Sequence, residues 1–203
     1  MNLLPLEYGK FLVKVARTAV EELLLNGIKL SIPPNTPHEL FEERGVFVTI
    51  KTFPADQLRG CIGFPEPVMP LIEATIDAAI SAATKDPRFP PMSPSELENV
   101  TFEVTVLTPP ELLDVPPEKL PEAIKVGRDG LIVRCGFASG LLLPQVPVEW
   151  GWNEEEFLSQ TCLKAGLPPD CWKSPYCQIY RFQGQIFKEI EPYGDVVEEK
   201  IEN

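Results

Sequence analysis

Hydrophobic residues recur at helical and strand spacings in separate blocks along the first half of the chain. From Pro5 to Leu25 they recur about every four residues until Asn26-Gly27 supplies a stop, which predicts an amphipathic helix. GVFVTIKT at 45–52 alternates between apolar and polar residues, and LRGCI at 58–62 follows after a polar turn, which predicts a hairpin. The same spacings predict a helix at 68–84 packed on this hairpin, a short capped turn at Ser93, and a strand at 100–108.

A similar order of elements follows in the second half. The expected elements are apolar segments at 123–126 and 131–135 around the turn GRDG, a strand at 140–146, a helix from Asn153 to Gly166, and a hairpin at 178–190 around Gln183-Gly184. Two successive sets of strands and a helix predict an α+β fold rich in antiparallel strands, with two similar strand–helix units in one body. The acidic tail from 191 to 203 is expected to fray.

Charge narrows the classes of partner. The 203 residues include 18 basic and 30 acidic side chains, and the net charge of -12 repels a phosphate backbone, so we expect no nucleic-acid partner. No apolar run is long enough to span a membrane and no secretory signal precedes the first helix, which favours a cytoplasmic protein. The fingerprints G-x4-GK and G-x-G-x-x-G are absent, so no cofactor is expected.

The five cysteines are read as reduced thiols. They are an odd number, which excludes complete internal pairing, and a cytosolic chain keeps its thiols reduced. No pair has C-x2-C spacing, and His38 is the one histidine, so no metal site is expected. A Cys–His dyad would have to use His38, which as a residue of a proline-rich loop is more typical of a solvated side chain.

The heptapeptide QLRGCIG places Cys61 between Gly60 and Gly63, two residues after Arg59. In a strand Arg59 and Cys61 share a face at a separation of about 7 Å, so the arginine can stabilise a thiolate. The glycines leave space for a ligand or for another backbone. Two interpretations remain open: a reactive thiol, or a small residue in a packed hairpin.

A second polar concentration follows the helix at 68–84. KDPRFPP brings Lys85, Asp86 and Arg88 together at a helix end, in a frame stiffened by prolines. Arg88 could receive a carboxylate or phosphate, or could simply pair with Asp86. Glu103, in the middle of VTFEVTV, is either solvent-facing or a partner of one of the two arginines.

Six blocks in this order resemble the AMMECR-type domain of the AMME-syndrome critical-region family, and its archaeal members in particular: LRGCIG, KDPRFPPM, ELENVTFEVTVLT, VGRDGLIV, GLLLPQV and FLSQTCLKAGL. The resemblance covers nearly the whole chain. It implies a larger lobe of about residues 1–110 plus part of the C-terminal region, a smaller lobe within about 111–190, and a cleft between them. It also implies association with MEMO-type and radical SAM proteins, but no particular reaction.

Two functions follow from these observations. The first is an enzyme in which Cys61 is the reacting thiol, Arg59 acts on it, and Arg88 orients a small anionic substrate. Its expected substrate-binding residues are Gly60, Gly63, Lys85, Asp86, Arg88 and Glu103. The rival is a non-enzymatic module whose surface docks a protein partner. Exposure of Cys61 separates the two, since a buried thiol would favour the second function.

Overall fold

The computed structural model describes residues 3–199, which form helices and two antiparallel sheets. The chain divides into two compact units: one holds the described residues up to Leu107 and those from Gln185 on, and the other is Thr108–Gly184. The structure is therefore α+β, as the hydrophobic pattern predicts. None of the helices in the described part of the chain is both long and apolar enough to cross a bilayer.

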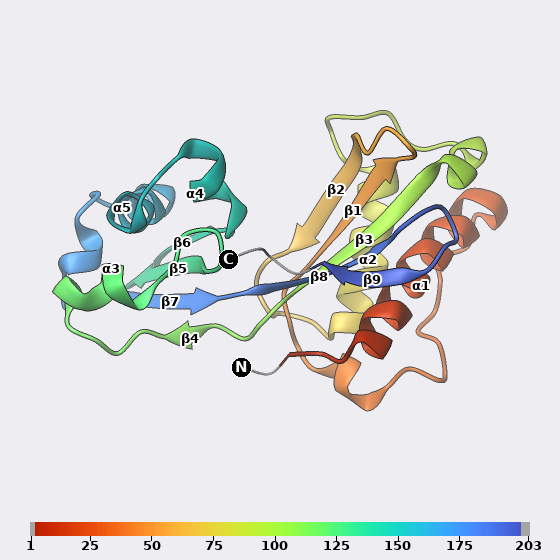
Figure 1. The fold of residues 1–203 in the computed structure, drawn as a ribbon. Helices are drawn as coiled ribbons and strands as arrows, with labels where there is room; N and C mark the ends of the chain where they lie inside the picture. The colour runs from red at the N-terminus through yellow and green to blue at the C-terminus, as the bar shows by residue number, and fades with distance from the viewer. Residues whose placement is uncertain (1–2, 200–203) are drawn as a thin grey trace. The chain divides into compact units, whose positions relative to one another are not determined.

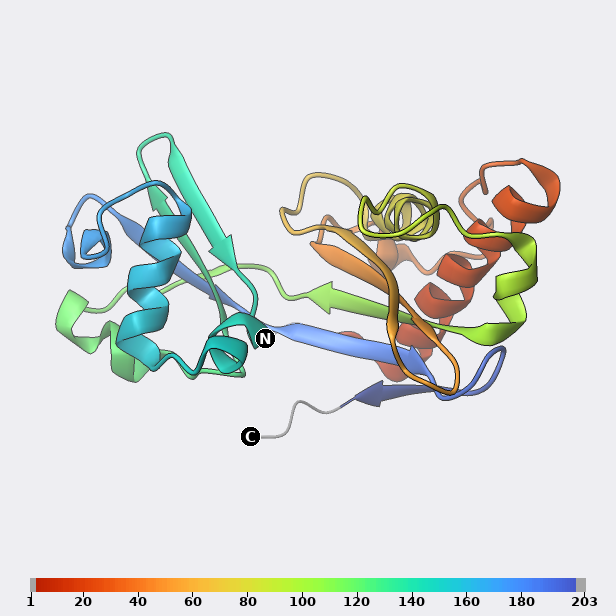
Figure 2. The same ribbon diagram turned by 90° about the horizontal axis from the view of Figure 1, so that it is seen from above.

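The first unit is built on a five-stranded sheet with the order β2-β1-β3-β8-β9 (Figures 1 and 2). The strands are β1 (Val46–Thr52), β2 (Leu58–Phe64), β3 (Val100–Leu107), β8 (Gly184–Glu189) and β9 (Val196–Glu199). Helices α1 (Leu6–Glu21) and α2 (Leu71–Thr84) lie side by side on one face of this sheet. A π-helical turn (Glu22–Asn26) extends α1, and two 3-10 helices, His38–Phe41 and Pro94–Asn99, complete the unit.

Alternation along the strands separates the two faces of this sheet. In β1, Val46, Val48 and Ile50 are fully buried beneath the helices, and the residues between them are half-buried. We call the opposite side the helix-free face; it carries the alternate residues Phe47, Thr49, Lys51, Cys61, Gly63, Thr101, Glu103 and Thr105. Helix α2 packs on β1 and β2, which confirms the expected packing of the helix at 68–84 on the hairpin.

The second unit has a four-stranded sheet with the order β4-β7-β5-β6. Its elements are β4 (Glu111–Leu112), a 3-10 helix (Pro117–Lys119), α3 (Leu120–Ala123), β5 (Gly130–Cys135), β6 (Ala138–Leu142), α4 (Gln145–Trp150), α5 (Glu154–Lys164), a 3-10 helix (Cys171–Lys173) and β7 (Gln178–Phe182). Helix α5 packs on β5 and β6 around a core that includes Leu131, Val133 and Phe157.

The two units share one connectivity. In each unit a hairpin is followed by a helix and then by a third strand, which pairs with the free side of the hairpin's first strand. In the first unit these elements are β1, β2, α2 and β3, and in the second they are β5, β6, α5 and β7. The sheet order β2-β1-β3 thus corresponds to β6-β5-β7. The prediction of two similar strand–helix units is confirmed at the level of topology.

Three local predictions for the second half and the tail are wrong. The segment 178–190 is not a hairpin, because β7 pairs with β5 and β4 while β8 joins the other sheet beside β3 and β9. The strand at 140–146 ends at Leu142, since the helix α4 begins at Gln145. In the tail, Val196–Glu199 form β9 on β8 rather than fraying, whereas residues 200–203 lie outside the described part.

The expectation of five reduced thiols is also wrong. Cys135 is bonded to Cys177 and Cys162 to Cys171, with Cα atoms 4.4 and 5.9 Å apart. An odd count excludes only complete pairing, and the partners become neighbours through the folding of the second unit. Among residues 3–199, Cys61 is the free cysteine.

Candidate functional site

Cys61 lies in the middle of β2, which is an edge strand of the five-stranded sheet. Its side chain is half-buried on the helix-free face, where the Thr49 hydroxyl donates a hydrogen bond of 3.3 Å to Sγ. A hydroxyl that donates to the sulfur fixes the orientation of the thiol. The structure therefore holds a reduced thiol that is neither deep in the core nor freely exposed.

The segment that follows α2 covers the open edge of β2 at this residue. The Asp86 carboxylate accepts a hydrogen bond of 2.9 Å from the backbone N–H of Cys61, and Arg88 Nη2 donates to the Cys61 carbonyl at 3.3 Å. These two side chains thus pair with the backbone groups that a neighbouring strand would otherwise engage. The motifs LRGCIG and KDPRF are separated in the sequence by the end of β2 and by α2. In the structure they meet at Cys61.

Asp86 and Arg88 form a close ion pair. Arg88 Nε and Nη2 donate to the two carboxylate oxygens at 3.0 and 2.8 Å. The hydrogen bonds from the Arg88 guanidinium hold the pKa of Asp86 far below its ordinary value, although burial of the carboxylate opposes this shift. The Asp86 side chain is 2% exposed and that of Arg88 is 55% exposed, so the cationic end of the pair faces solvent.

Arg59 has a different partner from the one that the sequence indicates. Its Nε donates to Glu96 Oε1 at 2.7 Å and its Nη2 to the Pro90 carbonyl at 3.0 Å. The hydrogen bond from Arg59 lowers the pKa of Glu96, against the opposing effect of burial. The charge of Arg59 is thus balanced by Glu96, and its bonds tie β2 to the segment before β3 rather than to the thiol.

Phe89 lies close to both guanidinium groups. The ring centroid is 5.9 Å from Arg59 Cζ and 5.7 Å from Arg88 Cζ, within the range of a cation–π contact. The stiff aromatic and proline segment after Asp86 therefore holds both arginines near the edge of β2.

Glu103 pairs with neither arginine. The register places it opposite Thr49 on β3, just as Cys61 lies opposite Thr49 on β2, so the three residues form a row across the helix-free face. The Glu103 side chain is 14% exposed and accepts a hydrogen bond of 3.2 Å from Lys51 Nζ. Burial lowers the pKa of Lys51, but the Glu103 carboxylate outweighs this effect and raises the pKa above its ordinary value.

The remaining expected site residues do not form a binding site beside the thiol. Neighbouring atoms fill the space beside the two glycines, and Lys85 lies apart. Gly60 faces α2, and a Cβ there would collide with the Ala82 carbonyl oxygen. The space beside Gly63 is taken by the ring of Phe47. Lys85 is exposed after α2 and lines a different pocket, of about 430 Å³, against that helix.

Sequence reasoning missed three residues that organise the site: Thr49, Lys51 and Glu96. The capping box at Ser93 singles out Glu96, but only as a helix cap, and in the structure Glu96 serves both Ser93 and Arg59. Thr49 and Lys51 are polar positions of an alternating strand, so their presence on the helix-free face follows from the pattern. Their hydrogen-bond partners on β2 and β3 do not follow from this pattern.

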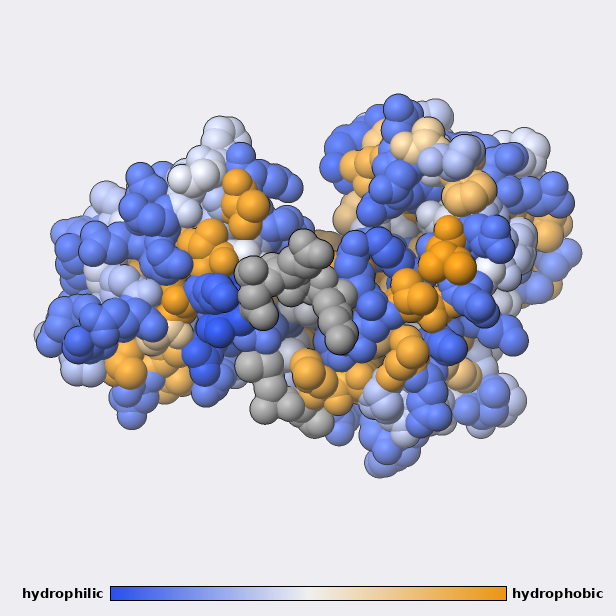
Figure 3. Space-filling model, in the orientation of Figure 1, coloured by the Kyte–Doolittle hydropathy of each residue, from blue (hydrophilic) through white to orange (hydrophobic). Residues whose placement is uncertain are grey.

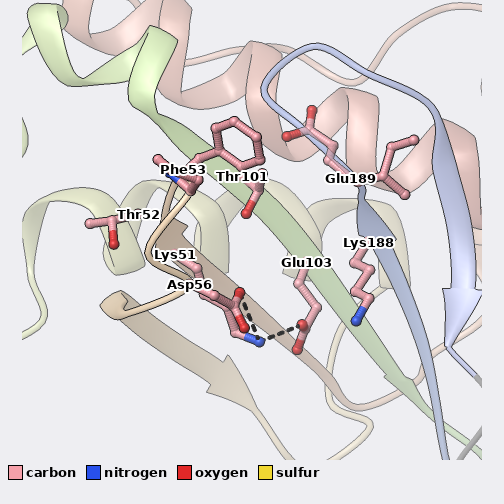
Figure 4. A pocket seen from close by; sticks show the side chains of 10 residues that line it. Lys51, Thr52, Phe53, Asp56, Thr101, Glu103, Lys188 and Glu189 are labelled. Atoms are coloured by element: carbon pink, nitrogen blue, oxygen red, sulfur yellow. Dashed lines mark hydrogen bonds and ion pairs between the residues drawn. The ribbon is translucent and has the colours of Figure 1, made fainter.

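A pocket of about 330 Å³ opens on the helix-free face at the end of β1 (Figure 4). Its lining residues are Lys51, Thr52, Phe53, Pro54, Asp56, Thr101, Glu103, Lys188, Glu189 and Ile190. Cys61 is not among them. All ten residues belong to the first unit.

In the view of Figure 3, hydrophilic residues cover most of the visible surface and hydrophobic residues form scattered groups.

Comparison with known proteins gives one consistent result. The sequence model of the AMMECR1 family matches residues 13–187. Protein TK0174 of Thermococcus kodakarensis is 60% identical over 193 residues, which cover 94% of each chain. Protein MJ0810 of Methanocaldococcus jannaschii is 56% identical over 202 residues, 99% of this chain and 100% of that one. The crystal structure of uncharacterized protein PH0010 from Pyrococcus horikoshii, 57% identical, matches with a TM-score of 0.78 over 95% of this chain and 97% of that chain.

Proposed function

The chain belongs to the AMMECR1 family, and we propose that it is an enzyme in which the Cys61 thiol acts as a nucleophile on a small anionic substrate. The observation that carries the proposal is the Asp86–Arg88 pair. Asp86 fixes the backbone of Cys61 from a buried position, and Arg88 keeps more than half of its side chain exposed beside the same residue. A fixed nucleophile beside an accessible guanidinium is an arrangement that can orient an anion for attack.

The other residues have supporting roles in this proposal. Thr49 orients the sulfur, and Arg59 is a positioning residue that holds β2 against Glu96. Gly60 and Gly63 contribute by letting α2 and Phe47 pack closely around the thiol strand.

The proposal can be tested with two alkylating reagents of equal size and different charge. Iodoacetate is an anion and iodoacetamide is neutral, so the ratio of their rates at Cys61, relative to the same ratio for free glutathione, measures the local preference for anions. We expect this normalised ratio to exceed one, and to fall about threefold in Arg88→Gln. That factor is the effect of one charge at about 7 Å in water.

Lys164→Gln is the matched control, because it removes the same charge from an exposed helix position in the second unit. It should leave the ratio unchanged. Peptide mapping under non-reducing conditions identifies the labelled residue. Failure of Cys61 to react before the protein unfolds, or an equal ratio in the wild type and in Arg88→Gln, would refute the thiol site.

A second proposal is a non-enzymatic module that docks a MEMO-type or radical SAM protein. Three exposed aromatic side chains of the second unit favour it: Phe137 is 111% exposed, Tyr176 86% and Trp150 70%. Aromatic residues are enriched in protein interfaces. Under this proposal, replacement of Cys61 by serine leaves partner binding unchanged, whereas replacement of Trp150 by alanine weakens it.

A further inference from the structure

The pocket at the end of β1 has a charge pattern that the thiol site does not use. Four charged side chains follow one another across it with alternating sign in Figure 4: Asp56, Lys51, Glu103 and Lys188. Lys51 Nζ lies 4.0 Å from Asp56 Oδ1 and 3.2 Å from Glu103 Oε2. The Lys51 ammonium group thus has a carboxylate on each side.

We propose that this pocket binds a small zwitterion with an apolar side chain, of the class of the free aliphatic amino acids. The ligand's carboxylate would lie against Lys188, and its ammonium group against Glu103, which uses only Oε2 for Lys51. A ligand with a single charge meets one attractive and one repulsive neighbour in such a row. A zwitterion satisfies both signs at once.

Three of the ten lining residues supply apolar surface for the rest of such a ligand. Phe53 is 41% exposed and Ile190 is 54% exposed, and Pro54 is also exposed. A volume of about 330 Å³ lies within the range of small-molecule sites, about 300–1,000 Å³. The lining therefore combines seven polar or charged residues with three apolar ones, which suits a small ligand that carries two charges and a short apolar side chain.

The turn that forms one side of the pocket is fixed by hydrogen bonds. Thr52 N–H donates to the Gln57 carbonyl at 2.8 Å, and Asp56 N–H donates to the Thr52 carbonyl at 2.8 Å. Phe53 N–H donates to the Asn99 carbonyl, also at 2.8 Å. Binding would therefore cost little ordering of the chain.

Other ligand chemistries fit this row of charges less well. The described residues contain no cluster of three or more His, Cys, Asp or Glu side chains that could hold a metal ion. Lys188 pairs with Glu199 at 2.6 Å and Lys51 has two acidic neighbours, so a simple anion at either lysine would face a carboxylate without an ammonium group of its own to offset the repulsion. A simple amine would meet the two lysines.

The test compares three ligands of similar shape on ¹⁵N-labelled wild-type protein by NMR titration: leucine, 4-methylpentanoate and isoamylamine. The latter two lack the ammonium group and the carboxylate of leucine, respectively. We expect leucine to shift the amide signals of 51–56, 101–103 and 188–190 with a Kd of about 1 mM or lower. Each single-charge analogue should bind at least about tenfold more weakly. This series needs no variant, so it does not depend on the folding of a mutant.

Variants then assign the two ends of the ligand. Lys188→Gln should weaken leucine binding about tenfold and leave isoamylamine unaffected, and Glu103→Gln should weaken both leucine and isoamylamine. Lys164→Gln is the charge-matched control and should bind leucine as the wild type does. Cys61→Ser should also bind normally, which separates this pocket from the thiol site. The proposal is overturned if leucine moves none of these signals, or if an analogue with one charge binds as tightly as leucine.

Discussion

Asp86 carries a negative charge in a position that is almost closed to water. Burial of a lone carboxylate is strongly unfavourable, and here its oxygens accept hydrogen bonds from the Cys61 and Arg88 backbone N–H groups and from the Arg88 guanidinium. The pKa of Asp86 is accordingly far below its ordinary value. This one residue joins the end of α2 to the edge of β2, so its charge state bears on the stability of the thiol strand.

At the residue scale, we expect Asp86→Asn to destabilise the protein in a pH-dependent way. A carboxyl group whose pKa is lower in the folded than in the unfolded state stabilises the fold above the unfolded value, about 3.9, and this contribution is lost as the pH falls below it. Urea unfolding at pH 7 should show a loss of about 3 kcal/mol. The difference between wild type and variant should shrink steadily from pH 5 to pH 2.

Asp114→Asn serves as the control for this measurement, because Asp114 is exposed. It should change the free energy of unfolding by less than about 0.5 kcal/mol at either pH. A difference between wild type and Asp86→Asn that stays constant from pH 7 to pH 2 would show that the charge of Asp86 does not stabilise the fold.

At the scale of elements, periodicity predicts which residues face a core but not which strands become neighbours. The helix that ends at Gly27, the strands β1 and β3, and the cap of α5 by Asn153 all follow from local patterns. The segment 178–190 also alternates correctly, yet its two strands pair in different sheets. The same limit applies to the site. The sequence indicates Cys61, Asp86 and Arg88, whereas the pairing of Arg59 with Glu96 depends on a long-range contact.

Gly60 shows how closely two elements meet beside the thiol. A Cβ at this position would collide with the Ala82 carbonyl oxygen of α2, and a backbone atom of a packed helix cannot turn away. Gly60→Ala should therefore reduce the free energy of unfolding by about 1–3 kcal/mol. Cys61→Ala, at the next residue on the opposite face of β2, should change it much less. Equal stabilities of the two variants in urea titrations would contradict the packing of α2 on β2.

At the scale of the whole molecule, both disulfides lie in the second unit and the free thiol lies in the first. Sequence spacing could not pair these cysteines, because Cys135 and Cys177 are 42 residues apart and meet only when β7 pairs with β5. Separate cores around Phe102 and Phe157 support the two units, and the smaller unit gains most from covalent links.

The disulfides should stabilise the second unit selectively. The chain-entropy model gives about 4 kcal/mol for the Cys135–Cys177 link, with its separation of 42 residues, and about 3 kcal/mol for Cys162–Cys171, with its separation of 9. Reduction with a phosphine should thus increase hydrogen exchange in peptides from Thr108–Gly184 while those from β1 and β3 keep their protection.

A thiol count in denaturant should give one group per chain before reduction and five after it. Five groups before reduction would restore the assignment of five free thiols, and loss of protection in β1 and β3 would show that the links stabilise the first unit as well.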